Sequence, residues 1–206
     1  MKKFAVLFLT LSLCLCSCAP KNARALTDEE IAQVNDAFFF MIENETGEAE
    51  INPLTCMLMD YYDRPEEMPL KNFLQYFPAE GDVTTAEEFE ALKTLADFPF
   101  QEVSSVSEMP VPLHRIPAAD VEEQLQQYMG DSIDDLKKTD GVLYLDSYDA
   151  YYTYTSDAGG GYFNCESGEL DDNTLLLYGS STAGPCVITM KNIENNWKII
   201  SHQATA

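Results

Sequence analysis

The stretch GVLYLDSYDAYYTYT, residues 141–155, decides the fold class, because here the apolar pattern changes to a period of two. Residues 142–145 predict one strand. Residues 148–155 predict another, with Tyr148, Ala150, Tyr152 and Tyr154 on one face and Asp149, Tyr151, Thr153 and Thr155 on the other. The same residues also fit a helical stripe, but their β-branched and aromatic content favours a strand.

Further strands follow this stretch, and helical patterns precede it. We predict strands at 162–166, 174–178, 186–191 and 197–202, with a turn at Gly159-Gly160-Gly161 and a hairpin turn at Asn195-Asn196. Upstream we predict helices at 27–46, 54–61, 70–76, 84–96, 118–129 and 132–136, a strand at 98–106 and an extended segment at 113–116. Helices followed by an antiparallel meander indicate an α+β fold with the helices packed on the sheet. The order is also similar to the cystatin-like cone, an analogy of fold alone.

The N-terminus has the pattern of an export signal. Lys2 and Lys3 precede an apolar run, 4–16, that is too short to cross a bilayer. Leu15-Cys16-Ser17-Cys18 resembles a bacterial lipobox, which implies lipidation of Cys18 and cleavage before it. We therefore expect a signal peptide at 1–17, a lipidated tether at 18–26 and one domain at 27–206. The alternative is an ordinary signal peptide with Cys18 incidental.

Charge excludes one class of partner. The chain has 12 Lys+Arg against 35 Asp+Glu, a formal charge of −23, whereas nucleic-acid binders need basic clusters. Loss of the leader removes Lys2 and Lys3 and brings the charge to −25. An anionic membrane surface repels such a body, so we expect contact with the membrane through the lipid alone.

Cysteines and acids give no metal motif or cofactor motif. Cys56, Cys165 and Cys186 remain after processing, an odd number; Cys165 and Cys186 either pair or stay as buried free thiols. The abundant acids lack the calcium-binding loop pattern, although 169–172 is a local candidate. We expect no cofactor. The two histidines, His114 and His202, accompany no G-x-S-x-G turn.

Tyrosine is concentrated where the strands begin. Six of the 11 tyrosines fall within residues 144–162. We interpret one face of the 148–155 strand as core and the other as exposed, with flat rings beside carboxylates and hydroxyls that suit a sugar or peptide. The alternatives are a half-buried strand with tyrosines at its rim and, for His114-Arg115, a structural pair bonded to Asp120 or Glu122. The candidate ligand-binding residues are His114, Arg115, Asp149, Tyr151, Thr153 and Asp157.

The mature chain resembles a group of uncharacterised secreted lipoproteins of Gram-positive gut anaerobes. The residues that carry the resemblance are 51–54, 61–63, 73–78, 114–117, 148–152 and 156–159. The group implies no activity. We expect a lipid-anchored, non-catalytic module on the outer face of the membrane that binds a glycan, a peptide or an envelope protein. The alternatives are a hydrolase with carboxylates in a cone-shaped pocket and a structural lipoprotein.

Overall fold

A computed structural model describes residues 23–39, 42, 43, 47, 49–78, 81–83, 85–155 and 161–205. The fold is α+β, as the sequence predicts. The α-helices are α1 (Asp28–Val34), α2 (Leu70–Tyr76), α3 (Ala86–Leu92) and α4 (Ala118–Tyr128). The strands are β1 (Arg24–Ala25), β2 (Ile42–Glu43), β3 (Ala49–Glu50), β4 (Gly81–Asp82), β5 (Leu113–Pro117), β6 (Leu143–Leu145), β7 (Ala150–Tyr154), β8 (Phe163–Asp171), β9 (Thr174–Ser181), β10 (Gly184–Ile193) and β11 (Asn196–Ala204).

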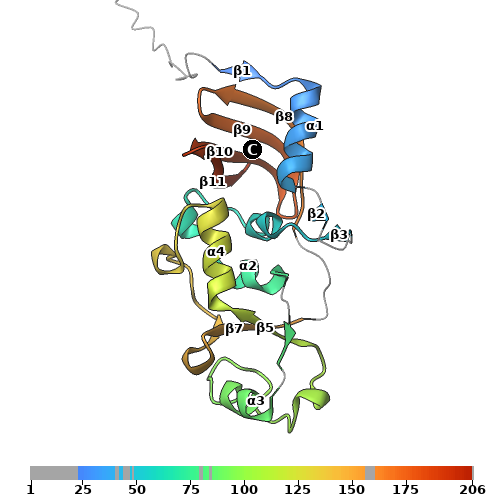
Figure 1. Cartoon of the computed structure of the whole chain (residues 1–206), viewed down its shortest axis with the longest axis vertical. Coiled ribbons are helices and arrows are strands. Elements are labelled where there is room, and N and C mark those ends of the chain that lie inside the picture. Colours follow the sequence, from blue (N-terminus) through green and yellow to red (C-terminus); the bar gives the residue numbers. More distant parts are fainter. Residues whose placement is uncertain are drawn as a thin grey trace, which may run out of the picture.

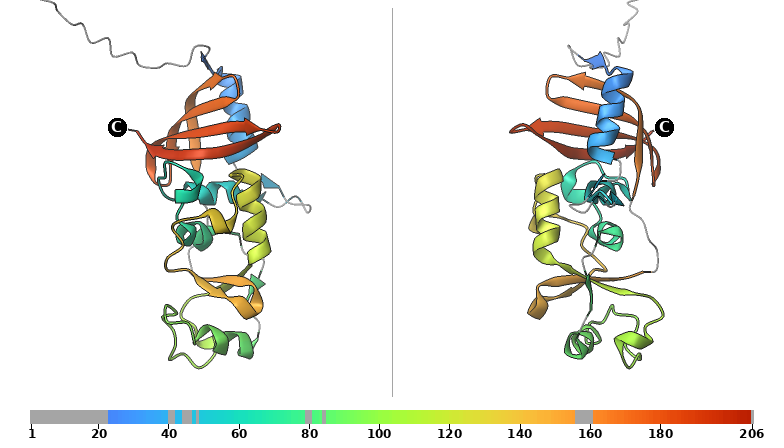
Figure 2. Two further views of the ribbon diagram at one scale, coloured as in Figure 1. Left: turned by 90° about the vertical axis from the view of Figure 1, so that its left-hand side faces the viewer. Right: turned by 45° about the vertical axis from the view of Figure 1, so that its right-hand side comes forward.

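The C-terminal strands form the antiparallel meander expected from their spacing. Its order is β1-β8-β9-β10-β11, and α1 packs on one face of this sheet (Figures 1 and 2). The β10–β11 hairpin turns at Glu194 and Asn195, which have φ of 54° and 66°, one residue earlier than predicted. β1 lies within the expected tether, 18–26, so the end of that segment belongs to the sheet. The cystatin-like cone stays a prediction.

A second sheet lies between α2 and α3, in the half of the elongated molecule away from the meander (Figures 1 and 2). Its order is β4-β5-β7-β6. Both of its faces are covered, because neighbouring residues of β7 belong to different hydrophobic clusters: Tyr151 to the larger cluster and Tyr152 to the smaller. The two clusters therefore meet at this sheet.

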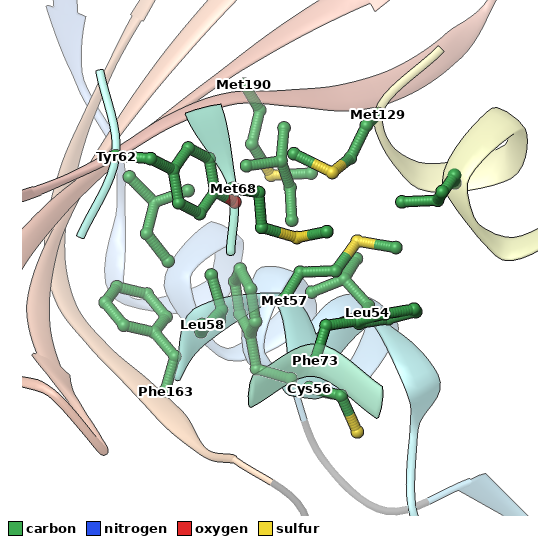
Figure 3. Packing of buried hydrophobic residues seen from close by; sticks show 14 of the residues in the cluster. Leu54, Cys56, Met57, Leu58, Tyr62, Met68, Phe73, Met129, Phe163 and Met190 are labelled. Atoms are coloured by element: carbon green, nitrogen blue, oxygen red, sulfur yellow. The ribbon is translucent and has the colours of Figure 1, made fainter. Parts of the chain in front are cut away.

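The larger cluster joins the meander to α2, α4 and the 3-10 helix Pro53–Leu58. Figure 3 shows four methionines gathered in it, Met57, Met68, Met129 and Met190, close to Tyr62. Flexible thioethers suit the irregular space between a sheet and short helices. The smaller cluster is built from α3, the segment 98–113 and the inner faces of β6 and β7.

Several predicted elements differ from the structure. The strand predicted at 148–155 begins only at Ala150, because Asp146–Tyr148 form a 3-10 helix and Asp149 is left-handed. The helix predicted at 84–96 is shorter and ends at Leu92. The helix predicted at 27–46 begins as expected with a Thr27–Glu30 capping box, but α1 ends at Val34 and continues as a π-helical turn, Asn35–Phe39. Gly47 lies beyond this helix with a φ of 80°. The strand predicted at 98–106 is wrong, because these residues form turns before a 3-10 helix, Val106–Glu108. Its aromatic side chains fill the smaller cluster without pairing to a strand.

Candidate functional site

A cleft opens where β6 and β7 separate, and it is the best-defined candidate site in the described part of the chain. Its volume is about 390 Å³, within the range of roughly 300–1,000 Å³ that is usual for small-ligand pockets. The wall on one side is β7, and the facing walls come from α2, Asp97 and the segment that enters β6. The lining residues are Lys71, Leu74, Gln75, Asp97, Gly141, Val142, Leu143, Tyr152, Thr153 and Tyr154.

Gly141 explains why the cleft exists. Its φ of 72° lies in the left-handed region, which a glycine adopts without steric cost. The chain turns there, and its pairing with β7 starts only at Leu143, opposite Tyr152. A side chain at position 141 would also approach Lys71, because a Cβ built there lies 3.4 Å from the Lys71 Nζ. Both the turn and the space beside it therefore depend on this glycine.

The cleft presents groups of both charges. Lys71 is exposed on α2, and Asp97 is exposed in the loop after α3. Within the described ranges neither side chain forms an ion pair or a hydrogen bond. Gln75 adds a donor and an acceptor, and Thr153 adds a hydroxyl. A ligand in the cleft can therefore gain polar contacts without first breaking an internal ion pair.

A buried polar network supports β7 from behind. The Glu88 carboxylate accepts a hydrogen bond from the Tyr152 hydroxyl and lies 3.2 Å from the Arg115 Nε. The Arg115 guanidinium also donates to the Tyr148 carbonyl at 3.1 Å. Burial and the carboxylate together raise the pKa of Tyr152. The network ties α3, β5 and β7 together and holds the cleft wall in place.

The hydrogen-bond partners of Arg115 differ from those expected from the sequence. The sequence suggested Asp120 or Glu122, whereas the structure pairs Arg115 with Glu88, from a helix 27 positions earlier. His114 pairs with Thr153 across β5 and β7, and its Nε2 lies 3.4 Å from the Thr155 carbonyl oxygen.

The remaining predicted site residues do not form one exposed strip. Tyr151 is only 7% exposed, because its face of β7 packs on the larger cluster, so the expected exposure of this ring is wrong. Asp149 precedes β7 in a left-handed conformation, φ 47°, and accepts a hydrogen bond from Tyr144 at 2.8 Å. Of the five candidates that the structure describes, Thr153 alone lines the cleft. Asp157 and the expected lipidation site, Cys18, lie outside the described residues.

Tyr152 and Tyr154, which the alternation of residues 148–155 places on one face, both border the cleft, and Tyr152 is also buried in the smaller cluster. Lys71, Gln75 and Asp97 were missed, because they come from segments far from β7 in the sequence and belong to no motif. The Asp140-Gly141 pair before an apolar run was the one local signal of a turn at this place.

A second polar cluster is fully buried beside β11. The His202 Nε2 lies 2.9 Å from the Ser181 Oγ, and its Nδ1 lies 2.7 Å from the Asp60 carbonyl oxygen. His202 is 0% exposed, and burial lowers its pKa. The neutral ring donates from Nδ1 and accepts from Ser181, so it fastens the segment before Tyr62 to the last strand. The role of His202 is structural, because its ring is not accessible from the surface of the protein.

Cys165 and Cys186 are separate buried thiols, which decides the question that the sequence left open. Within the described residues, no three His, Cys, Asp or Glu side chains are grouped to hold a metal ion. The helices of that same part are all too short or too polar to span a membrane. Comparison of the chain with protein-family models, curated proteins and solved structures found no match.

Proposed function

We propose that this protein is a lipid-anchored extracellular domain that binds a ligand in the cleft between α2, β6 and β7. The observation that carries the proposal is the cleft itself: about 390 Å³ beside a rigid strand, with Lys71 and Asp97 unpaired within the described ranges. A buried network and two hydrophobic clusters fix its β7 wall, so little ordering is needed on binding.

The anchor and the cleft lie at different places along the molecule. Residues 24–25 sit at the outer edge of the meander, whereas β7 crosses the opposite half, toward α3 (Figure 1). Lipidation at Cys18 would therefore attach the meander end to the membrane and direct the cleft half away from it. A body with a formal charge of −25 favours this stance, because the anionic membrane surface repels it.

Thermal unfolding of the full-length protein in detergent tests the binding proposal. The panel contains short peptides, oligosaccharides and peptidoglycan fragments, each added at high concentration. A ligand present at 100 times its Kd stabilises the folded state by about 2.7 kcal/mol, which raises Tm by a few degrees. Lys71→Ala and Asp97→Ala should reduce that rise, whereas Lys191→Ala, a lysine on β10 remote from the cleft, should not.

If no ligand raises Tm, or if the cleft variants respond as the native protein does, the cleft is not the site. Release of cleavage products from a panel member would favour the hydrolase alternative. The anchor is tested separately by Cys18→Ala and cell fractionation. We expect the variant to leave the membrane fraction, and a variant that stays there would contradict lipid anchoring.

A further inference from the structure

The edge of β7 that faces the cleft carries backbone groups without a strand beside them. Pairing of β6 with β7 covers Leu143–Leu145 and ends at Tyr152, although β7 continues to Tyr154. Gly141 diverts the chain before the ladder can extend further. The cleft thus occupies the place that the next residues of a neighbouring strand would fill.

A hydrogen bond of the next residue shows which way the backbone of Tyr154 points. The Thr155 N–H donates to the Pro112 carbonyl on the β5 side of β7. The N–H and C=O of one residue lie on the same edge of an antiparallel strand, and successive residues alternate edges. Tyr154 therefore directs both groups toward the β6 side.

The hydrogen bonding of β5, which pairs with β7, also places the Tyr154 backbone groups on the β6 side. Leu113, which is opposite Tyr154, accepts from the Val83 N–H on the far side of β5, so it directs its backbone groups away from Tyr154. Among the described residues, therefore, neither the β5 pairing nor the β6 pairing gives the N–H and C=O of Tyr154 a hydrogen-bond partner. One donor and one acceptor of the main chain are thus available at the cleft.

We infer that the ligand of this cleft is an extended peptide that adds to β7 as a strand, pairing its main chain with Tyr154. This inference rests on the proposed function and names its ligand class. Strand addition gains affinity from main-chain hydrogen bonds and specificity from pockets for alternate side chains. A glycan can stack on the Tyr154 ring, but it offers no alternating row of amides to this edge.

The charges of the cleft define the peptide further. Asp97 suits a basic side chain or an N-terminal amine, and Lys71 suits a carboxylate. The net charge of the whole chain, −23, attracts cationic peptides and speeds their association at low ionic strength. The ligand that fits best is a short peptide with a net positive charge and at least one carboxylate.

The test uses the full-length protein in detergent and a library of randomised hexapeptides. The tightest binder is resynthesised with each amide N-methylated in turn, and Kd is measured by calorimetry. Strand addition predicts that methylation of the amide facing Tyr154 weakens binding at least tenfold, while methylation of its neighbours changes Kd less than threefold. A flat methylation profile would overturn the inference, and this series needs no variant of the protein.

Two variants of one residue separate the main chain from the side chain. Tyr154→Pro removes the cleft-facing N–H and leaves the β5 ladder intact, so it should weaken the peptide at least tenfold. Tyr154→Ala keeps the N–H and should weaken it less than fivefold. Equal losses from both variants would assign binding to the ring and would overturn strand addition.

The remaining outcomes distinguish the inference from the proposed function. Oligosaccharides that bind where hexapeptides do not, with loss in Lys71→Ala, would overturn the peptide inference and leave the cleft as the site. A hexapeptide whose Kd is unchanged in Lys71→Ala, Asp97→Ala and both Tyr154 variants would overturn both.

Discussion

Arg115 shows how one side chain can decide whether a carboxylate is tolerated in the interior. Glu88 has a side chain only 4% exposed, and Arg115 is its ion-pair partner. Arg115→Ala leaves that charge buried, and we expect a loss of about 3 kcal/mol in the free energy of unfolding. Urea unfolding measures it. Glu90→Ala, which removes a largely exposed carboxylate paired with Lys93 at the end of the same helix, should cost less than about 1 kcal/mol. Similar losses in the two variants would refute the distinction.

His202 is the second residue with a measurable consequence. Burial lowers its pKa in the folded state, so the unfolded chain binds its proton more readily. Stability from this residue is complete above the unfolded value of about 6.5 and declines as pH falls below it. Between pH 7.5 and 5.5 we expect a loss of up to about 1.4 kcal/mol from this group. His202→Gln should be less stable at pH 7.5 but flatter across that interval, and an equal decline in both proteins would exclude His202 as its origin.

At the scale of elements, the free edge of β8 depends on one amide. The Asn35 side chain accepts from the Cys165 N–H at 2.9 Å and donates to the Cys165 carbonyl at 3.1 Å, so it occupies the place of a neighbouring strand. Asn35→Ala orphans two buried backbone groups and should cost about 2 kcal/mol or more in urea unfolding. Asn173→Ala, at an exposed turn, is the matched control. Equal stability of the two variants would show that the edge does not need the amide.

The same residue explains how far the sequence could predict the elements. Capping and period-two signals are local, so the start of α1, the ends of α4 and the meander strands were predictable. The end of α1 was not, because the helix changes from α to π geometry at Asn35, whose side chain bonds to Cys165, 130 positions away. The cleft could not be predicted from the sequence for the same reason. The strand pattern around Thr153 made it a candidate site residue, but Lys71 and Asp97 come close to it only in the tertiary fold.

At the scale of the whole molecule, the three thiols of the described residues report on its integrity. Cys56, Cys165 and Cys186 are buried, and burial raises the pKa of Cys56 to about 12 and that of Cys165 to about 11. Thiolate is the reactive form, so the native protein should react slowly with a thiol reagent. The protein unfolded in urea should react rapidly at all three positions. Rapid reaction of one thiol without urea would reveal local opening around that cysteine.

The hydrogen bonds between residues 60–62 and His202 determine the order in which parts of the fold can form during synthesis of the chain. The chain is synthesised from its N-terminus, but the Asp60 carbonyl and the Tyr62 backbone bond to His202, a residue about 140 positions downstream. The Asn35 side chain likewise bonds to Cys165, which is synthesised 130 residues later. Long-range pairing of this kind slows folding, because each of these contacts closes a long loop of the chain. The contacts of the methionine-rich cluster with β11 can therefore form only after the rest of the chain has been made, and a chain truncated before β11 lacks Ile199 of the core as well as His202.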